Sequence, residues 1–600
     1  MNTRLARTLI AALVAGLFAP VAGAESNAEL LKKIEALSAE LARLKTQVEA
    51  SSANAAASQK ATEELKQRVV QSEARAVKTE ERAIASEERL AKAEEKSTER
   101  WLTIGGDYQF RVDRLGGQTK PFTDVTATFA NAQQQLQATF FANPTPANGQ
   151  MLTGLMGFAQ GMVGVRTYDQ ARTFLGANGA MLQGLQNYAA QVPAYKPENQ
   201  ALYTNRFGLD LHAKATQDVS VSVRLVMYKT FGAGDDDAVT NGGSAPYFAD
   251  RVGVFDGTLG HVPSSSYLNV DRAFATWSNI ADQDIWFSVG RRPSTHGAPS
   301  NLRLNTPRPG NGGTPSLLVD YAFDGMTVGW APDIDGLPGA YAKICYGRGF
   351  ESGFRSTPGN SLQDTDMLGV AVIPIDTDPL RVWLQWNRGM NIFDAPKMRD
   401  TYFGNTMPKA NLGDIDWYGA GAMGTLKRVG SGDLNYFADL GMSVTHPNDN
   451  VSSQFGFQGL LTGAFFNPEA PKDKTGTAIA LGLRYDLPSK TKLGVEYNHG
   501  SKNWITFAPA ATDMWTSKVG TRGNVYELYL IQELNSKPVS SHLAKAFVRL
   551  GLQYYDFQYT GSNNWVGAPV KMSSVNAGTM MATTPLDHAY NAYATFEVKF

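Results

Sequence analysis

The charged residues best placed to act together lie in one glycine- and proline-rich segment, residues 292–325. The segment and its mouth carry Arg291, Arg292, Arg303, Arg308, Asp320 and Asp324. Separated cations and anions at the narrowest point of a pore produce a transverse field that sets ion selectivity. If the segment is instead an exposed loop, its arginines would suit lipopolysaccharide phosphates. The sequence leaves both interpretations open, and a candidate constriction loop is one of them.

Catalytic and metal-binding residue types do not occur in the spacing that such sites require. The seven histidines show no close pairing, and the lone Cys345 excludes a disulfide framework, a cysteine-rich zinc site and CxxCH haem attachment. The acidic run Asp235–Asp237 could hold Ca²⁺, but it lacks EF-hand or RTX spacing, which favours a solvated loop. No G-x-S-x-G, HExxH or P-loop motif occurs. We therefore expect no enzyme, no cofactor and no metal; a protease or lipase would need turnover abolished by one Ser or Asp substitution.

The composition indicates an extended β protein. The 600 residues include 55 basic and 56 acidic side chains, so the formal charge is −1 and a basic nucleic-acid footprint is excluded. Charged residues make up 18% of the chain, glycine occurs 58 times and aromatic residues reach 10%. No apolar run attains the roughly 18 residues of a membrane-spanning helix. These features favour an extended β protein over a soluble enzyme.

Residues 1–24 are typical of a secretory signal peptide. Arg4 and Arg7 precede an apolar stretch over residues 9–19, and the small-residue site Ala22-Gly23-Ala24 follows. The alternative is a short buried helix. The signal predicts export of the chain from residue 25.

Residues 25–100 predict a coiled-coil stalk. The segment from Ser26 to Arg100 has no Gly and no Pro. Its apolar residues follow alternating spacings of four and three: Leu30, Ile34, Leu37, Leu41, Leu44 and Val48. This seam is typical of a coiled coil, with a dimer or a trimer both open. A solvated single helix or a disordered linker is the alternative.

Residues 101–600 read as strands with alternating polar and apolar side chains. In Asp107–Asp113, Tyr108, Phe110 and Val112 share one face while the intervening polar residues share the other. The polar faces of this and later strands supply a predicted lumen lining of Asp107, Arg111, Arg206, Asp210, Lys214, Arg224, Arg484 and Glu496. Short and long connections alternate along the chain, which is typical of membrane barrels. With residues 316–323 assigned to the third long loop, the count is sixteen antiparallel strands.

The last strand carries the most specific signal. Tyr590, Phe596, Val598 and Phe600 lie on one face, and the printed sequence ends on that aromatic residue. A closed membrane sheet needs such an apolar outer face on every strand, and a terminal Phe resembles a barrel-insertion signal. The alternative is the chance end of a soluble strand.

Two further features concern the barrel's rim. Aromatic residues near strand ends predict girdles at the membrane boundary. They are Trp383, Trp386, Trp417, Tyr418, Tyr554, Tyr555, Phe557 and Tyr559. We expect some of them to pack in the lumen or in loops instead. The first long loop, residues 114–203, contains stretches that could be helical. It would plug the lumen, cover the mouth or be disordered.

These features together resemble a known family. The signal, the coiled coil, the opening strand Trp101–Asp113, the segment Val289–Thr295 and the terminal strand are similar to proteobacterial outer-membrane porins with an N-terminal periplasmic coiled coil. Some of these porins are grouped with phosphate- or anion-selective porins. The resemblance implies an outer-membrane all-β barrel that passes small hydrophilic solutes or ions by passive diffusion. We see no run of Lys or Arg on neighbouring inward faces that would carry over anion selectivity.

The expected partners follow from this location. They are outer-membrane lipid and lipopolysaccharide, further copies of the chain in a dimer or trimer, and peptidoglycan, with no nucleic acid. Two rival functions stay open. The barrel would be a sheath for a separate multihaem cytochrome in electron transfer, or a blocked tether between the outer membrane and the cell wall.

Overall fold

The computed structural model describes residue 46 and residues 101–231, 265–292, 298–306, 317–320, 322–354, 362–396, 398–401, 404–508, 512–540 and 544–600. The chain divides into two units, Met1–Arg100 and Trp101–Phe600. Apart from Thr46, the signal peptide and stalk lie outside the described residues, and so do Asp235–Asp237 and Arg308. The inferences about these segments therefore remain predictions.

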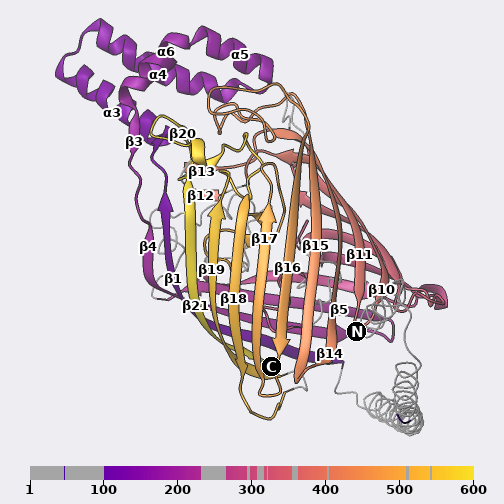
Figure 1. Ribbon diagram of the computed structural model, residues 1–600. Helices are drawn as coiled ribbons and strands as arrows, with labels where there is room; N and C mark the ends of the chain where they lie inside the picture. Colours follow the sequence, from indigo (N-terminus) through magenta and orange to yellow (C-terminus); the bar gives the residue numbers. More distant parts are fainter. Residues whose placement is uncertain are drawn as a thin grey trace, which may run out of the picture. The chain divides into compact units, whose positions relative to one another are not determined.

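Sixteen antiparallel strands close into one barrel, which confirms the predicted fold class (Figure 1). The barrel strands are β1 (Leu102–Thr119), β4 (Glu198–Lys214), β5 (Val219–Thr230), β6 (Ser265–Trp277), β7 (Ile285–Arg292), β8 (Phe323–Trp330), β9 (Tyr341–Phe350), β10 (Thr365–Asp376), β11 (Arg381–Phe393), β14 (Asn411–Val429), β15 (Gly432–Pro447), β16 (Lys474–Asp486), β17 (Thr491–Gly500), β18 (Gly523–Glu533), β19 (Lys545–Phe557) and β21 (Leu586–Lys599). Each strand pairs with its neighbours along the chain, and β1 closes the ring against β21. Closure leaves no unpaired sheet edge.

The register at closure fixes which side chains face outward. Phe110 of β1 lies opposite Phe596 of β21 and Asn205 of β4. Because side chains alternate along a strand, a slip by one residue would turn Tyr108, Phe110 and Val112 of β1 inward. Phe596 and Phe600 are partly exposed on the outer face, as the alternation of the last strand predicts.

The two faces of the barrel differ in polarity. Exposed apolar side chains cover the outer face and include Val328, Ile344, Leu384, Leu440, Leu483, Leu528 and Leu550. Buried polar side chains point inward and include Gln109, Asn435, Asp439, Arg484, Glu496, Glu527, Arg549 and Asn591. The strands thus present apolar side chains outward, unlike the surface of a soluble protein, and the interior buries charges beside an apolar cluster that includes Leu318, Trp383 and Phe507.

The first long connection is mostly helical and lies at the end of the barrel opposite the short turns (Figure 1). Its helices are α3 (Val125–Ala142), α4 (Pro146–Gly164), α5 (Tyr168–Ala177) and α6 (Gly179–Leu185). The side chains of Asp124, Thr145 and Thr167 accept hydrogen bonds from the first turns of α3, α4 and α5, which fixes where these helices begin. Val165 and Ala171 pack on Val451 and other residues of the loop between β15 and β16, so this connection lies over the barrel's loops.

Short elements complete the described fold. A three-stranded sheet joins β2 (Phe122–Asp124), β3 (Ala190–Val192) and β20 (Met580–Met581), and a two-stranded one joins β12 (Met398–Thr401) and β13 (Gly404–Thr406). Among the described residues, four 3₁₀ turns occur: η2 (Gln186–Tyr188), η4 (Ile280–Asp282), η5 (Lys518–Gly520) and η6 (Met572–Ser574). None of the helices in the described ranges has the length and apolar character needed to cross a bilayer.

Five cross-strand pairs on the inner wall place an aromatic ring beside a glycine. The pairs are Gly329 with Trp286, Gly421 with Trp383, Gly482 with Phe437, Gly494 with Tyr529 and Gly551 with Tyr593. A Cβ on any of these glycines would lie 2.1–2.3 Å from the facing ring. The rings therefore occupy the space that side chains at these positions would need, which accounts for part of the chain's high glycine content.

Only some of the residues predicted to form aromatic girdles lie on the outer face of the barrel. Trp386, Tyr418 and Tyr554 lie on the outer face, whereas Trp383, Trp417 and Tyr555 are buried inside the barrel. Trp383 and Trp386 are three residues apart, and an odd spacing on one strand puts two side chains on opposite faces. Adjacent aromatic residues in the sequence therefore divide between the outer face and the interior.

Candidate functional site

A short loop segment, Leu302–Asn305, lies inside the barrel and is held there through its backbone. Four consecutive carbonyl oxygens of this segment each accept a hydrogen bond from a different basic side chain of the wall. The pairs are Arg484 with Leu302 (2.7 Å), Arg549 with Arg303, Lys599 with Leu304 (2.7 Å) and Lys545 with Asn305 (2.7 Å). We call Leu302–Asn305 the pinned segment; it belongs to the connection between β7 and β8, the predicted constriction loop.

The side chain of Arg303 reaches into a buried group of charges. It forms an ion pair with Asp513 and lies 3.5 Å from Glu527 of β18. Burial lowers the pKa of the Arg303 guanidinium, but the two carboxylates outweigh that effect and raise the pKa well above its usual value. Arg303 therefore carries a permanent positive charge inside the barrel.

Lys518 joins the same group from the connection between β17 and β18. Its ammonium contacts Glu496 of β17 and lies 2.6 Å from Glu527. The hydroxyl of Tyr593 donates to Glu527 at 2.7 Å, and that of Tyr529 donates to Glu496 at 3.1 Å. All these side chains are buried, so each depends on the others to compensate for its lost hydration.

A second inward segment, around Phe507, contacts another part of the connection between β7 and β8. The backbone of Phe507 pairs with that of Leu318, which accepts a hydrogen bond of 2.9 Å from the Phe507 amide. Arg522 donates to four backbone carbonyls, those of Trp504 (3.0 Å), Thr560 (3.2 Å), Gly561 (2.7 Å) and Asn564 (2.5 Å). Burial lowers the pKa of Arg522 to about 9, so the group is still charged at neutral pH. Loops thus fill the part of the interior next to β14–β19.

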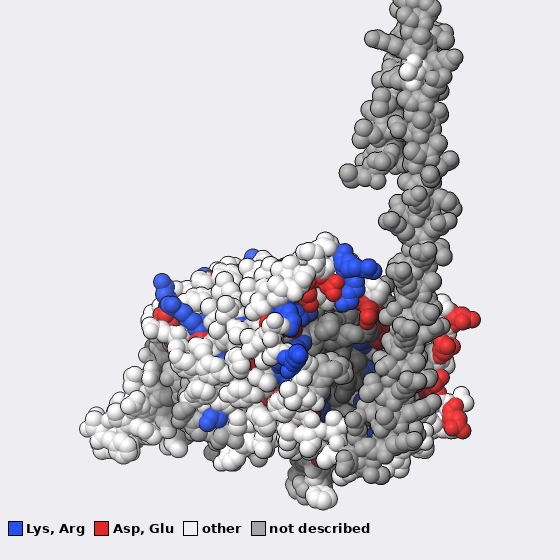
Figure 2. Space-filling view, turned by 90° about the horizontal axis from the view of Figure 1, so that it is seen from below, with Lys and Arg blue, Asp and Glu red and all other residues white. Residues whose placement is uncertain are grey.

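The wall formed by β1, β4, β5 and β6 carries an alternating charge network. Arg224 contacts Asp107, lies 2.5 Å from Asp210 and lies 3.9 Å from Asp271. Arg206 lies 3.2 Å from Asp107. This charged wall faces the pinned segment across a cavity of about 430 Å³. From the end that carries the short turns, basic and acidic side chains surround a hollow (Figure 2).

The eight predicted lumen residues all fall on the inner face of their strands. Arg206, Asp210, Arg224 and Asp107 meet in the charged wall, and Arg484 and Glu496 hold the pinned segment and Lys518. Arg111 is buried, pairs with Asp113 at 2.6 Å and stacks 4.3 Å above the ring of Tyr593. Lys214 lies exposed at the last position of β4, apart from the others.

The predicted constriction residues are not all in one place. Arg291 and Arg292 are the last residues of β7, and Asp324 is the second residue of β8, so these three belong to the wall and not to the loop. Arg291 and Asp324 form a 3.5 Å ion pair on the outer face. That part of the prediction is wrong, because the strand continues to Arg292 and alternation sends Arg291 outward.

The remaining constriction residues behave differently from one another. Arg303 lies within the lumen, as the constriction hypothesis expects. The backbone amide of Asp320 donates to the Phe507 carbonyl at 2.8 Å, at the second inward segment. Among the described constriction residues, Arg303 contacts the buried charges of the interior through its side chain.

Sequence reasoning missed a row of basic residues on neighbouring inward faces. The row consists of Arg206 of β4, Arg224 of β5, Arg272 of β6 and Arg292 of β7. Lys343 of β9 and Arg381 of β11 also face inward, further round the wall. Arg224 and Arg272 are direct cross-strand partners. The expectation of no such run is therefore wrong. This row could have been predicted if the strands had been delimited correctly, because alternation along a strand assigns each of its residues to the inner or the outer face.

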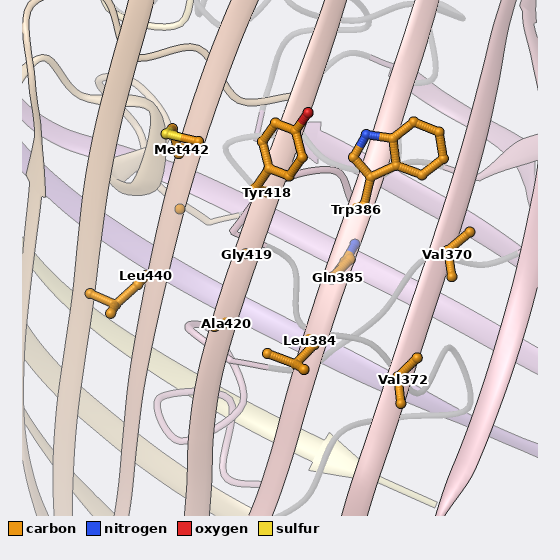
Figure 3. A pocket seen from close by; sticks show the side chains of 11 residues that line it. Val370, Val372, Leu384, Gln385, Trp386, Tyr418, Gly419, Ala420, Leu440 and Met442 are labelled. Atoms are coloured by element: carbon orange, nitrogen blue, oxygen red, sulfur yellow. The ribbon is translucent and has the colours of Figure 1, made fainter.

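The outer wall has one groove of note. An apolar hollow of about 510 Å³ crosses β10, β11, β14 and β15, with Leu384 and Leu440 at its sides and Ala420 between them (Figure 3). Tyr418 and Trp386 lie toward one end of it (Figure 3). The groove belongs to the apolar outer face and does not open to the lumen side chains described above.

The described residues offer no metal centre: no group of three or more His, Cys, Asp or Glu side chains among them is arranged to hold an ion. Residues 235–237 are not covered by that statement.

Comparisons with known proteins give one family match. A family model with the description "Protein of unknown function (DUF3373)" matches residues 196–600. No curated protein matches the chain.

Solved structures similar to the chain include an anion-selective porin from Comamonas acidovorans (11% identity, 83% of this chain, 99% of that chain, TM-score 0.35). Others are OprB from Pseudomonas putida (11%, 83%, 94%, 0.36) and OmpT, an outer membrane protein of Vibrio cholerae (10%, 84%, 99%, 0.33). Likenesses at this level carry no argument about activity, which has to rest on the geometry above.

Proposed function

The chain belongs to the DUF3373 family, and we propose that it is an outer-membrane porin through which small hydrophilic solutes or ions diffuse passively. The observation that carries the proposal is the inverted polarity of the closed barrel. Its outer face is apolar, and its inner face holds a connected set of charges beside a cavity. A closed sheet satisfies its backbone without water, which is what a bilayer requires of strands.

The pinned segment gives the pore its proposed size limit. It occupies the side of the lumen next to β16–β21 and leaves the space along β1, β4, β5 and β6 as the route for solutes. Charges on that route, chiefly Arg206 and Arg224 with their aspartates, would guide permeating ions. The predicted leader and periplasmic stalk complete this proposal, with the stalk joining copies in a dimer or trimer.

The two rival functions fare differently. A cytochrome sheath needs an interior free for another protein, and the pinned segment with the loop around Phe507 takes up that interior. We therefore do not extend the proposal to the sheath. The loops inside the barrel are also compatible with a blocked tether. A tether protein would bind peptidoglycan and show no conductance.

A cysteine-labelling experiment in planar bilayers tests the porin proposal. In a Cys345→Ser background, Ser222→Cys places a thiol on the inner wall at the cavity, and Val221→Cys places one on the outer face. A negatively charged methanethiosulfonate reagent should reduce the current through the Ser222→Cys protein and leave that through Val221→Cys unchanged. Absence of any conductance from the folded full-length chain would overturn the proposal.

A further inference from the structure

The cavity beside the charged wall has an excess of positive charge. The cations that line it are Arg206, Arg224, Arg272 and Lys599, and its carboxylates are Asp107, Asp210 and Glu597. Two charged residues outside the lining form ion pairs with lining residues: Asp271 lies 3.4 Å from Arg272, and Arg549 lies 2.7 Å from Glu597. Counted together, this set holds one more cation than carboxylates. A single negative charge would balance it.

Arg206 has spare hydrogen-bonding capacity at the cavity. It donates to Asp107 through a single nitrogen, Nη2, at 3.2 Å. Its Nε is buried and has no hydrogen-bond partner among the residues that the structure describes. Arg224, by contrast, is divided between Asp107 and Asp210. A buried donor without a partner is costly, and an anionic ligand would satisfy it.

The cavity also has an apolar side. Phe274 of β6 and Leu304 of the pinned segment both line it. Its volume of about 430 Å³ falls within the usual size of small-molecule sites. The ammonium of Lys599 donates a hydrogen bond to the Leu304 carbonyl, which holds the pinned segment against β21. This side of the cavity is therefore fixed in position.

We propose that this cavity is a binding site for a small organic monocarboxylate, with the carboxylate at Arg206 and the apolar part of the solute against Phe274 and Leu304. The proposal rests on the porin function and adds to it a solute class and a residence point. A carboxylate accepts the free donors of Arg206, and its charge balances the lining. The solute pauses there on its way through the barrel.

Saturation-transfer NMR titration of the folded full-length protein tests the site. The probes are propionate and its neutral isostere propionamide, at constant ionic strength. Wild type should bind propionate and not propionamide. Arg206→Gln should weaken propionate binding about tenfold or more, because it removes a charged hydrogen bond. Arg206→Lys should retain binding within a few-fold.

Arg388→Gln is the matched control, because Arg388 is partly exposed and pairs with Asp414 on another wall. Its binding should equal that of wild type. If Arg206→Gln does not fold, Arg272→Gln takes its place at the same cavity. Equal binding of both probes, or unchanged propionate binding in the Gln variant, would overturn the site.

Conductance of the same samples separates the two proposals. A chain that conducts but does not prefer propionate refutes the carboxylate site alone. A chain that binds propionate at Arg206 but carries no current refutes the porin function and leaves a binding cavity.

Discussion

Replacing Arg303 by methionine should destabilise the folded barrel strongly. Methionine keeps most of the side-chain length but removes the charge that faces Asp513 and Glu527. The side chains of all three residues are at most 3% exposed, so water cannot replace the lost partner. Lys518 alone would then face Glu496, Glu527 and the nearby Asp513.

The expected magnitude follows from the burial of these charges. Removing one partner of a buried ion pair costs about 3–5 kcal/mol, because the other partner stays charged in a poorly hydrated place. The backbone hydrogen bonds of the pinned segment survive the substitution, since they use the carbonyls and not the side chain. We therefore expect a folded but weaker barrel.

Urea titration of the protein in phospholipid vesicles measures the free energy of unfolding. Arg388→Met removes a partly exposed arginine and should cost less than about 1 kcal/mol. Asp513→Asn combined with Arg303→Met should recover about 1–3 kcal/mol relative to the sum of the single changes, because the uncompensated charge is gone.

Two results would refute the reasoning. One is a loss below about 1 kcal/mol for Arg303→Met, which would mean that the carboxylates are hydrated or protonated. The other is strict additivity of the two substitutions, which would mean that Arg303 and Asp513 do not interact.

Three further predictions concern other parts of the molecule. Gly482→Ala should cost about 1–3 kcal/mol in the same titration, because its Cβ would lie 2.1 Å from the ring of Phe437; Gly157→Ala in α4, with open space around it, should cost nothing or gain up to about 1 kcal/mol. Burial raises the pKa of Glu469, but hydrogen bonds from two lysines outweigh it and hold the pKa at about 2, so this group stabilises the fold above pH 4.5 and the contribution is lost as the pH falls toward 2. Glu469→Gln should remove about 1 kcal/mol at pH 7 and nothing at pH 2, and equal losses at both would contradict this. Leu440→Lys, near the middle of β15 on the outer face, should cost about 2–4 kcal/mol in vesicles if that face contacts lipid; a loss below about 1 kcal/mol would argue against it.

The fold was predictable because its pattern is local. Alternation within a strand and the length of each connection both appear in consecutive residues, and together they yield sixteen strands. Errors arose at strand ends. Extending β7 by a single residue moves Arg292 from loop to wall, and alternation along the strand places Arg291 on the outer face. One residue of uncertainty is enough to reverse such an assignment.

The interior was less predictable because its contacts are distant in sequence. Arg303 meets Asp513 and Arg549 across separations of 210 and 246 residues. Nothing in the spacing of the loop identifies these partners. The position and arginine content of the loop allowed either a loop inside the lumen or an exposed one, whereas the hydrogen bonds of Arg484 and Lys599 to its carbonyls are evident only in the closed barrel.

The glycine–aromatic pairs of the wall have a consequence for the bore of the cylinder. A tryptophan or tyrosine that stood upright from its strand would narrow the passage by the length of its ring. Beside Gly421 or Gly551 the ring can lie flat along the neighbouring strand instead. The barrel thus gains the rigidity of large side chains and keeps its cross-section for charges and water.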